Sequence, residues 1–372
     1  MMPGKLLKKW NSCFDKLSTN GKSLAPSTLP SFAASINSGR ALSPTKGVRR
    51  GLQQSARLSI LCFLSWTAAM VFVFAVPSWG NDKIRIAYPS SLTGIQVWVA
   101  QKQGIFEKNH LDAELLVIPT EIALMSQMAG ELDYTVFGTS VPGAVLNGAP
   151  LKILMWLYDR LDYTLVAQPE YKTVESLKGK IIGISSYNTS THDAVRAIFR
   201  AHGMDADRDS TILPMGRAAP RFQSFISGRA AASVFPSPRD FFAEAKGMVL
   251  LDDVRDKLDW PMTGVTVTLK KLAGNRDQVR RVIQSLVEAT RFYKDNKEAS
   301  IKLIEDWLKL PRAVAEKSYL KSLRYISYDG KTRETAVTNL IEATKKDLKK
   351  SGDFPPSLFI DYSPLNEVLS KK

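Results

Sequence analysis

Four short segments rich in hydroxyl groups are the parts of this 372-residue chain best suited to bind a small polar molecule. They are SSLTGIQ (90–96), GTS (138–140), SSYNTST (185–191) and FPSP (235–238). Each follows an apolar stretch that we expect to be a strand, and most lead into an expected helix. Ligands of open α/β sheets meet the loops at the carboxyl ends of the strands. A helix start adds free N–H groups and partial positive charge, which suit an anion or a polar oxygen.

The segment SSYNTST is the most informative, with six hydroxyl residues and one Asn in seven positions. Ser, Thr and Asn also cap helices without any ligand, so one such loop alone favours capping. Four loops at one cleft favour binding, and nearby arginines (Arg160, Arg217, Arg221 and Arg239) could reach the same place. The predicted ligand-binding residues are Ser91, Thr93, Gln96, Gly138, Thr139, Ser140, Ser186, Tyr187, Asn188, Thr189, Ser190 and Phe235.

An internal repeat predicts how these loops come together. KIRIAYPSS (83–91) returns as KIIGISS (180–186), and AGELDYTVFG (129–138) returns as SGRAAASVFP (227–236). The offset is 97 from Lys83 to Lys180, 99 from Gly104 to Gly203 and 98 from Gly130 to Gly228. Landmarks in one order at nearly one spacing indicate two copies of one α/β unit. Two similar lobes create a cleft, where small ligands commonly bind.

The apolar patterns predict an α/β fold of two lobes, each a mainly parallel sheet flanked by helices, with two crossing strands. We expect strands in 83–88, 115–118, 134–137, 152–156, 163–167, 180–185, 211–214 and 232–235, and a return crossing within 260–272. We expect helices in 95–103, 121–129, 141–146, 192–202 and 220–227, and a helical stretch from 275 to 347.

Composition argues against several functional classes. The net charge of +15 is concentrated in residues 1–57, which carry +9, and the basic residues after position 80 form no stripe with aromatic residues. We therefore expect no nucleic-acid partner. Cys13 and Cys62 both precede position 80, so no thiol nucleophile or thiolate metal site is expected after it. The three histidines form no ligand-spaced pair, and no phosphate loop or nucleophile elbow is present, so we predict no metal, no cofactor and no enzyme activity.

The N-terminal region has the features of a targeting sequence. Residues 1–57 are basic and rich in Ser, Pro and Gly, and we interpret them as a disordered extension. Residues 58–76 hold no charge and follow Arg49, Arg50 and Arg57, while Pro77, Ser78 and Gly80 are typical of a cleavage site after Gly80. The region 58–80 is therefore a signal peptide or, as the alternative, an uncleaved membrane anchor. Either one places the remainder outside the cytoplasm.

The ordered set KIRIAY, GIFEKNHLDAEL, GELDYTVFG and LVAQPEYKTVESLKGKIIGISS, with a closing FIDYSPLNEVL, resembles the substrate-binding proteins of ABC importers. The similar group includes sulfonate-, taurine- and thiamine-precursor-binding members. The resemblance implies a type II periplasmic binding protein fold, closure around a small ligand, and a membrane permease and an ATPase as partners. Ala231 stands where this group usually has an acidic residue, and the cysteine-rich motif of its pyrimidine-forming enzymes is absent.

These observations together predict a periplasmic or envelope solute-binding protein, a monomer that captures a small organic, anionic or polar ligand. The alternatives are an extracytoplasmic enzyme of lyase type on the same fold and a membrane-anchored sensing domain. The expected boundaries are 81–168 for the first part of lobe 1, 169–262 for lobe 2, and 263–372 for the return to lobe 1 and the helical C-terminal part.

Overall fold

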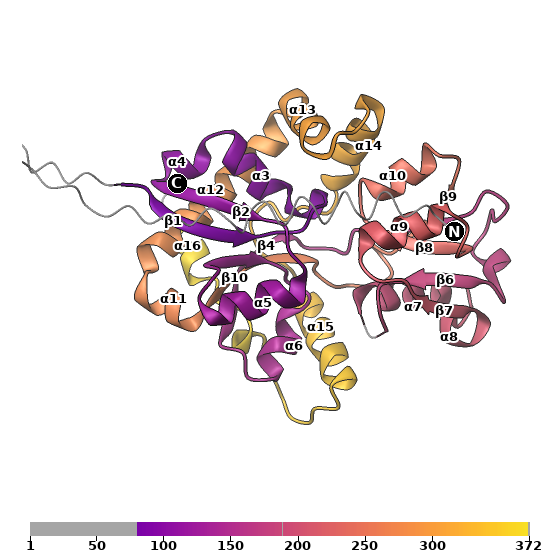
Figure 1. Ribbon diagram of the computed structural model, residues 1–372. Coiled ribbons are helices and arrows are strands. Elements are labelled where there is room, and N and C mark those ends of the chain that lie inside the picture. Colours follow the sequence, from indigo (N-terminus) through magenta and orange to yellow (C-terminus); the bar gives the residue numbers. More distant parts are fainter. Residues whose placement is uncertain (1–79, 188, 371–372) are drawn as a thin grey trace, which may run out of the picture. The chain divides into compact units, whose positions relative to one another are not determined.

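The computed structural model describes residues 80–187 and 189–370 (Figure 1). The predicted extension 1–57 and nearly all of the predicted signal or anchor region 58–80 lie outside these residues, as does Asn188. Within the described part of the chain, no helix has the length and hydropathy needed to cross a membrane.

A five-stranded sheet forms the centre of lobe 1. Its strand order is β2-β1-β3-β10-β4, and β10 runs antiparallel to both of its neighbours while β1 pairs in parallel with β2 and β3. The β-branched sequence TGVTVT explains why β10 is a strand, since such side chains pack well on a sheet surface. The strands are β1 (Asp82–Ala87), β2 (Leu111–Leu116), β3 (Tyr134–Val136), β4 (Leu151–Tyr158) and β10 (Thr263–Thr268).

A second five-stranded sheet, that of lobe 2, repeats this plan. Its order is β7-β6-β8-β5-β9, and here β5 is the antiparallel strand between two neighbours. Each sheet thus receives one reversed strand directly after the chain crosses from the other lobe. The strands are β5 (Thr164–Ala167), β6 (Ile181–Ile184), β7 (Thr211–Pro214), β8 (Ala232–Phe235) and β9 (Val249–Asp253).

The helices of the two lobes keep the same spacing as the strands. The pair α5 (Thr120–Ala129) and α9 (Ala218–Ile226) and the pair α6 (Val141–Leu146) and α10 (Arg239–Glu244) each begin 98 residues apart, as do β3 and β8 and also β4 and β9. The predicted repeat is therefore structural. The remaining helices of the two lobes are η1 (Leu92–Gly94), α3 (Ile95–Lys102), α4 (Ile105–Lys108), η2 (Glu175–Leu177), α7 (Ser190–Ala201) and α8 (Ala206–Asp209).

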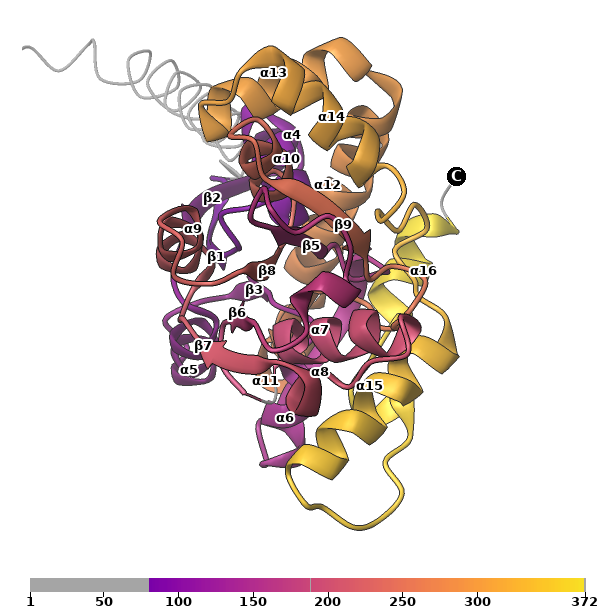
Figure 2. The same cartoon turned by 90° about the vertical axis from the view of Figure 1, so that its right-hand side faces the viewer.

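The C-terminal helices pack mainly on lobe 1. Helix α12 lies on α3, α16 lies on α12, and α15 lies on α6. Helix α14 differs, because it packs on α13 and also on α10 of lobe 2, and it lies beside α10 in both views (Figures 1 and 2). The bounds are α11 (Leu269–Gly274), α12 (Arg276–Asp295), α13 (Lys297–Leu308), α14 (Arg312–Ser322), α15 (Glu334–Asp347), η3 (Pro356–Leu358) and α16 (Ser363–Leu369).

The sequence predicted this architecture well, with a few local differences. The α/β fold with two sheets is confirmed, and Val279, Val282 and Ile283, which share one side of α12 by their helical spacing, are buried. The strand Thr164–Ala167 belongs to the second sheet, so the chain enters lobe 2 through 159–163, earlier than the expected boundary after residue 168. Residues 269–272 are helical rather than extended, because Thr268 caps α11 by accepting a hydrogen bond from the Lys271 N–H.

Candidate functional site

A cavity of about 370 Å³ lies between the carboxyl ends of the two sheets, and residues of both lobes line it. Ser91 and Thr93 follow β1, and Thr139 and Ser140 follow β3, so lobe 1 contributes the loops after two of its parallel strands. Lobe 2 contributes the corresponding loops after β6 and β8. This cavity is called the cleft below.

The lobe 1 wall of the cleft is made of hydroxyl groups held by backbone contacts. The Ser91 and Thr93 hydroxyl oxygens lie 2.8 Å apart. Thr263 is the first residue of β10, and its hydroxyl donates to the Thr93 carbonyl over 2.9 Å. The Thr139 N–H donates to the Met262 carbonyl over 3.2 Å. Both loops are thereby fastened to the returning crossover, which fixes the hydroxyls at the mouth of lobe 1.

A cluster of three hydroxyls forms part of the lobe 2 wall. The Ser185 hydroxyl lies 3.0 Å from that of Thr189 and 2.8 Å from that of Thr191, and the Thr189 and Thr191 hydroxyls are 3.0 Å apart. Thr189 is the N-cap residue of α7, but its side chain makes no capping hydrogen bond to the helix. Its hydroxyl instead contacts the Ser186 carbonyl over 2.8 Å. The side chain is therefore not used as a helix cap.

Three arginines line the same lobe 2 wall. Arg217 is the N-cap residue of α9, Arg221 lies one turn into that helix, and Arg239 begins α10. Arg217 is exposed, Arg239 is half-buried, and Arg221 is only 2% exposed. None of these three guanidinium groups forms an ion pair with a carboxylate of the described residues.

Arg221 is a buried cation without a counter-ion among the described residues. Its terminal nitrogens donate to the Gly216 carbonyl (2.9 Å) and the Val234 carbonyl (3.2 Å), and its Nε has no hydrogen-bond partner among the described residues. Burial lowers the pKa of Arg221 to about 10, and the charge of Arg239 contributes to the decrease. Burial also lowers the pKa of Arg239. Both groups are still cationic at neutral pH, so lobe 2 presents positive charge to the cleft.

The structure brings half of the predicted binding residues to the cleft. A further residue, Asn188, is outside the described part of the chain. The predicted residues that line the cleft are Ser91, Thr93, Thr139, Ser140, Thr189 and Ser190, and those that do not are Gln96, Gly138, Ser186, Tyr187 and Phe235.

The residues outside the cleft have clear structural places. Gln96 is fully buried and donates from Nε2 to the Leu157 carbonyl. Gly138 is glycine because a Cβ there would lie 2.2 Å from the Trp156 ring. Ser186 is exposed, and Tyr187, 55% exposed, points its hydroxyl at the Ile212 carbonyl. Phe235 is fully buried under Arg221.

Sequence reasoning did not place several lining residues in the site. Tyr163 reaches the cleft from the crossing into lobe 2, and its hydroxyl oxygen lies 3.2 Å from that of Ser190. Burial raises the pKa of this phenol. Glu121 enters from α5, while Arg160, which sequence proximity also indicated, instead pairs with Asp259. The other three arginines that the sequence indicated, Arg217, Arg221 and Arg239, do line the cleft.

Comparison with known proteins places the chain in a family. The sequence profile of the NMT1-like family matches residues 80–305. The chain belongs to the NMT1-like family. Among its relatives is a protein of Brucella abortus named as a binding protein, 27% identical over 262 residues, which are 68% of this chain and 80% of that protein.

Solved structures show the same fold as this member of the NMT1-like family. The ligand-binding component of an ABC-type import system from Staphylococcus aureus has a TM-score of 0.65 at 14% identity, covering 77% of this chain and 99% of its own. The nitrate-binding protein of Synechocystis has a TM-score of 0.66 at 11% identity, covering 78% and 88%. The alkanesulfonate-binding protein of Xanthomonas axonopodis, bound to MOPS, has a TM-score of 0.60 at 19% identity, covering 77% and 97%. The expected periplasmic binding protein fold is confirmed.

Proposed function

We propose that this NMT1-like protein is an extracytoplasmic solute-binding protein that captures a small organic anion between its lobes and delivers it to an ABC importer. The observation that carries the proposal is the pair Arg221 and Arg239. These are two desolvated cations at one cleft, and neither forms an ion pair with a described carboxylate.

An anionic ligand would compensate for the unfavourable desolvation of the two guanidinium groups. A buried charge is unfavourable unless a partner of opposite sign and hydrogen bonds compensate for its lost hydration. A planar guanidinium pairs especially well with carboxylate, sulfonate or phosphate oxygens. The hydroxyls of Ser91, Thr139 and Ser190, together with the N-terminus of α7, supply the neutral donors that would surround the other oxygens of such a group.

The comparisons support the transport role without naming the ligand for this chain. The Staphylococcus aureus neighbour is described as part of an ABC import system, and the Synechocystis and Xanthomonas neighbours are described as binding nitrate and alkanesulfonate. By analogy the partners would be a permease and an ATPase at the membrane, the protein would act as a monomer, and its place would be the periplasm or cell envelope. The intact mass of the protein from its native host tests export, because cleavage after Gly80 would leave Asn81 at the N-terminus.

Paired ligands that differ mainly in charge test the proposed function. Calorimetric titration with propanesulfonate against propanesulfonamide, and with benzoate against benzamide, should show binding of the anion and weak or absent binding of its neutral counterpart. Native mass spectrometry of the freshly purified protein should show a carried-over anion that leaves chemically unchanged. Equal binding of each neutral counterpart would contradict the anion assignment, and recovery of a converted product would indicate an enzyme instead.

A further inference from the structure

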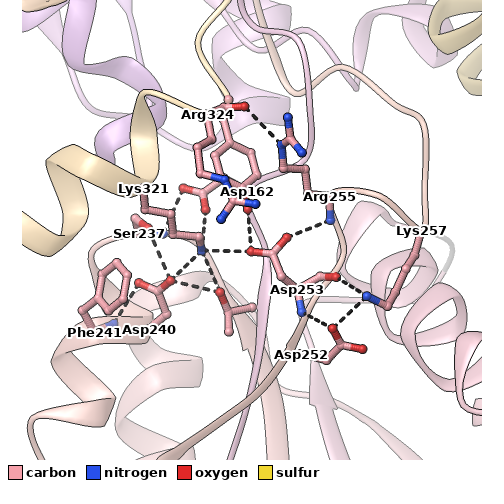
Figure 3. Close-up of polar contacts among 12 residues, drawn as sticks. Asp162, Ser237, Asp240, Phe241, Asp252, Asp253, Arg255, Lys257, Lys321 and Arg324 are labelled. Atoms are coloured by element: carbon pink, nitrogen blue, oxygen red, sulfur yellow. Dashed lines mark hydrogen bonds and ion pairs between the residues drawn. The ribbon is translucent and has the colours of Figure 1, made fainter.

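A buried lysine outside the cleft holds three carboxylates together where α14 meets lobe 2 (Figure 3). Lys321 is 9% exposed, and its Nζ lies 2.8 Å from Asp162 Oδ1, 2.7 Å from Asp240 Oδ2 and 3.6 Å from Asp253 Oδ2. It also donates to the Thr164 hydroxyl over 2.7 Å. Asp162 and Asp240 are fully buried. This group is called the Lys321 cluster below.

The members of the Lys321 cluster come from separate parts of the molecule. Asp162 lies in the crossing from lobe 1 to lobe 2, Asp240 lies in α10, and Asp253 ends β9. Lys321 lies in α14, which packs on α13, and α13 in turn packs on α3 and α12 of lobe 1. The ammonium therefore joins a C-terminal helix anchored on lobe 1 to the strand and helix framework of lobe 2.

The same carboxylates hold a loop that lines the cleft. Asp162 Oδ2 accepts a hydrogen bond from the Ser237 N–H over 3.1 Å, and Asp240 Oδ2 accepts one from the Ser237 hydroxyl over 3.3 Å. The Ser237 carbonyl accepts from the N–H of Leu92, in the η1 loop of lobe 1, over 3.3 Å. On either side of this serine, Pro236 and Arg239 line the cleft. Polar contacts thus link Lys321 through the two aspartates to Ser237, which lies two residues before Arg239, and through the Ser237 carbonyl to Leu92 of lobe 1.

Loss of the Lys321 ammonium would also disturb the contacts that Asp162 and Asp240 make with Ser237. Asp162 and Asp240 would be left as two neighbouring buried carboxylates with no cation between them, and removal of one partner from a buried ion pair is strongly unfavourable. Like charges in one site also repel, so one carboxyl would have to take up a proton or move toward solvent. Either response shifts the Ser237–Arg239 segment.

We infer that Lys321 is a positioning residue for ligand binding. Its ammonium fixes the loop before α10 against α14, and so sets both the place of Arg239 in the cleft and the spacing of the two lobes. The part that concerns binding rests on the proposed function, whereas the part that concerns the lobes does not.

Affinity for propanesulfonate tests the first part. Lys321→Met should weaken binding by about tenfold or more, because the arginine that the cluster positions moves with its loop. The double variant Lys321→Met/Asp240→Asn removes one charge of each sign and should recover much of the loss, a rescue that a general packing defect would not show. Lys317→Met, on the same helix but exposed and paired with Glu244, is the matched control and should stay within about twofold of the wild type.

Interlobe distances in the ligand-free protein test the second part. The chain has two cysteines, and Cys13→Ser and Cys62→Ser remove both from the full-length protein. Asp112→Cys in β2 and Arg208→Cys in α8 then provide one exposed spin-label site in each lobe. Pulsed dipolar spectroscopy should give a narrow distance distribution that broadens or shifts with Lys321→Met and narrows again in the double variant. An unchanged distribution, or unchanged propanesulfonate affinity in folded Lys321→Met protein, overturns the inference. If the wild type binds no anion, the proposed function fails while the distances still decide the role of Lys321.

Discussion

The guanidinium carbon of Arg221 lies 5.4 Å from the ring centroid of Phe235, and both side chains are buried. Phe222 and Phe225 flank the same ring, each with its centroid 5.4 Å away. A cation over an aromatic face gains electrostatic attraction when both are desolvated. The aromatic cluster therefore packs against Arg221, and Phe235, which does not line the cleft, would affect ligand binding through this arginine rather than by direct contact.

Replacing Arg239 should separate ligand affinity from stability. Arg239→Gln removes a desolvated charge that has no described ion-pair partner, so the ligand-free protein should melt at an unchanged or higher temperature. A lost hydrogen bond to a charged group, worth roughly 1.5–3 kcal/mol, should weaken propanesulfonate binding about ten- to a hundredfold. Thermal melts and calorimetry on the same samples measure both effects. Arg229→Gln, an exposed arginine of the same lobe, is the control, and a lower melting temperature with unchanged affinity would contradict a binding role for Arg239.

Thr189 and Tyr187 should respond differently, although both lie in the SSYNTST segment. Thr189→Ala removes a cleft hydroxyl, so affinity for propanesulfonate should fall by roughly three- to tenfold. The melting temperature should fall only modestly, because the hydroxyl contacts its neighbours in the loop but does not cap α7. Tyr187→Ala removes a largely exposed ring outside the cleft and should leave affinity within about twofold. If Tyr187→Ala has the larger effect on affinity in titration calorimetry, the loop must rearrange when ligand binds.

The fold was predictable because its signals are local and repeated. Helix ends at Gly104, Gly130 and Gly203 have left-handed backbone conformations that favour glycine, and these glycines marked the repeat in the sequence. Strand β9 escaped prediction because VLLDD has no clear alternation and its residues are only partly buried. The early entry into lobe 2 was missed because strand pairing, rather than any local pattern, assigns β5 to the second sheet.

The candidate site was only partly predictable, for a related reason. Small hydroxyl residues directly after strands, such as Ser91 and Thr139, reach the cleft because the backbone alone places them there. Long side chains depend on tertiary packing, and Arg160 and Arg221 illustrate this. Both are arginines near a predicted loop, yet Arg160 pairs with Asp259 while Arg221 is directed by Phe235 and two backbone carbonyls. Sequence position alone does not distinguish them.

Gly138 offers a test of close packing at the end of β3. A Cβ at this position would lie 2.2 Å from the buried Trp156 ring and 2.8 Å from the Gly264 nitrogen, so the backbone itself would have to move. Overpacking of this kind typically costs about 1–3 kcal/mol. Gly138→Ala should therefore lower the free energy of unfolding, measured in urea, by about 1–3 kcal/mol or more. Gly274→Ala is the control, because a Cβ there meets no atom of the described residues within 4 Å. Equal stabilities of the two variants would show that lobe 1 can relax around Trp156.

His202 should make the stability of lobe 2 depend on pH. Its Nε2 lies 2.8 Å from Asp252 and its Nδ1 lies 2.7 Å from Glu175, and these contacts, with Asp252 first, raise the pKa of the imidazole above 6.5. A raised folded-state pKa gives a stabilisation that is complete below the unfolded value and is lost as pH rises through the folded value. The melting temperature should therefore fall as pH rises above about 6.5.

Two substitutions isolate the contribution of this histidine. His202→Gln should melt lower than the wild type at pH 6, and the difference should shrink toward pH 8.5. Asp252→Asn removes the main cause of the raised pKa and should also flatten the pH dependence. A wild-type melting temperature that does not change over this range would show that the two carboxylates do not favour the imidazolium.

Ligand binding should draw the lobes together. On the proposed function, an anion held by Arg221 and Arg239 of lobe 2 would gain contacts to the hydroxyls of lobe 1 as the cleft narrows, so differential binding would stabilise the closed form. Small-angle scattering should show a smaller radius of gyration with saturating propanesulfonate, and the forward scattering should correspond to a monomer. Arg239→Gln at the same ligand concentration should show less compaction. An unchanged radius in wild-type protein shown by calorimetry to be saturated would argue for a rigid cleft.

The position of β10 has a consequence for how the chain acquires its structure. This strand, residues 263–268, lies between β3 and β4, so the first sheet has a gap in its middle until the whole of lobe 2 has been synthesised. Lobe 2, whose strands all fall between residues 164 and 253, contains its sheet in one continuous stretch and can fold first. Until β10 arrives, β3 and β4 present open edges to other chains, which is a hazard for aggregation. During synthesis or passage across a membrane, lobe 1 therefore completes its sheet only after lobe 2, although most of its strands are made earlier.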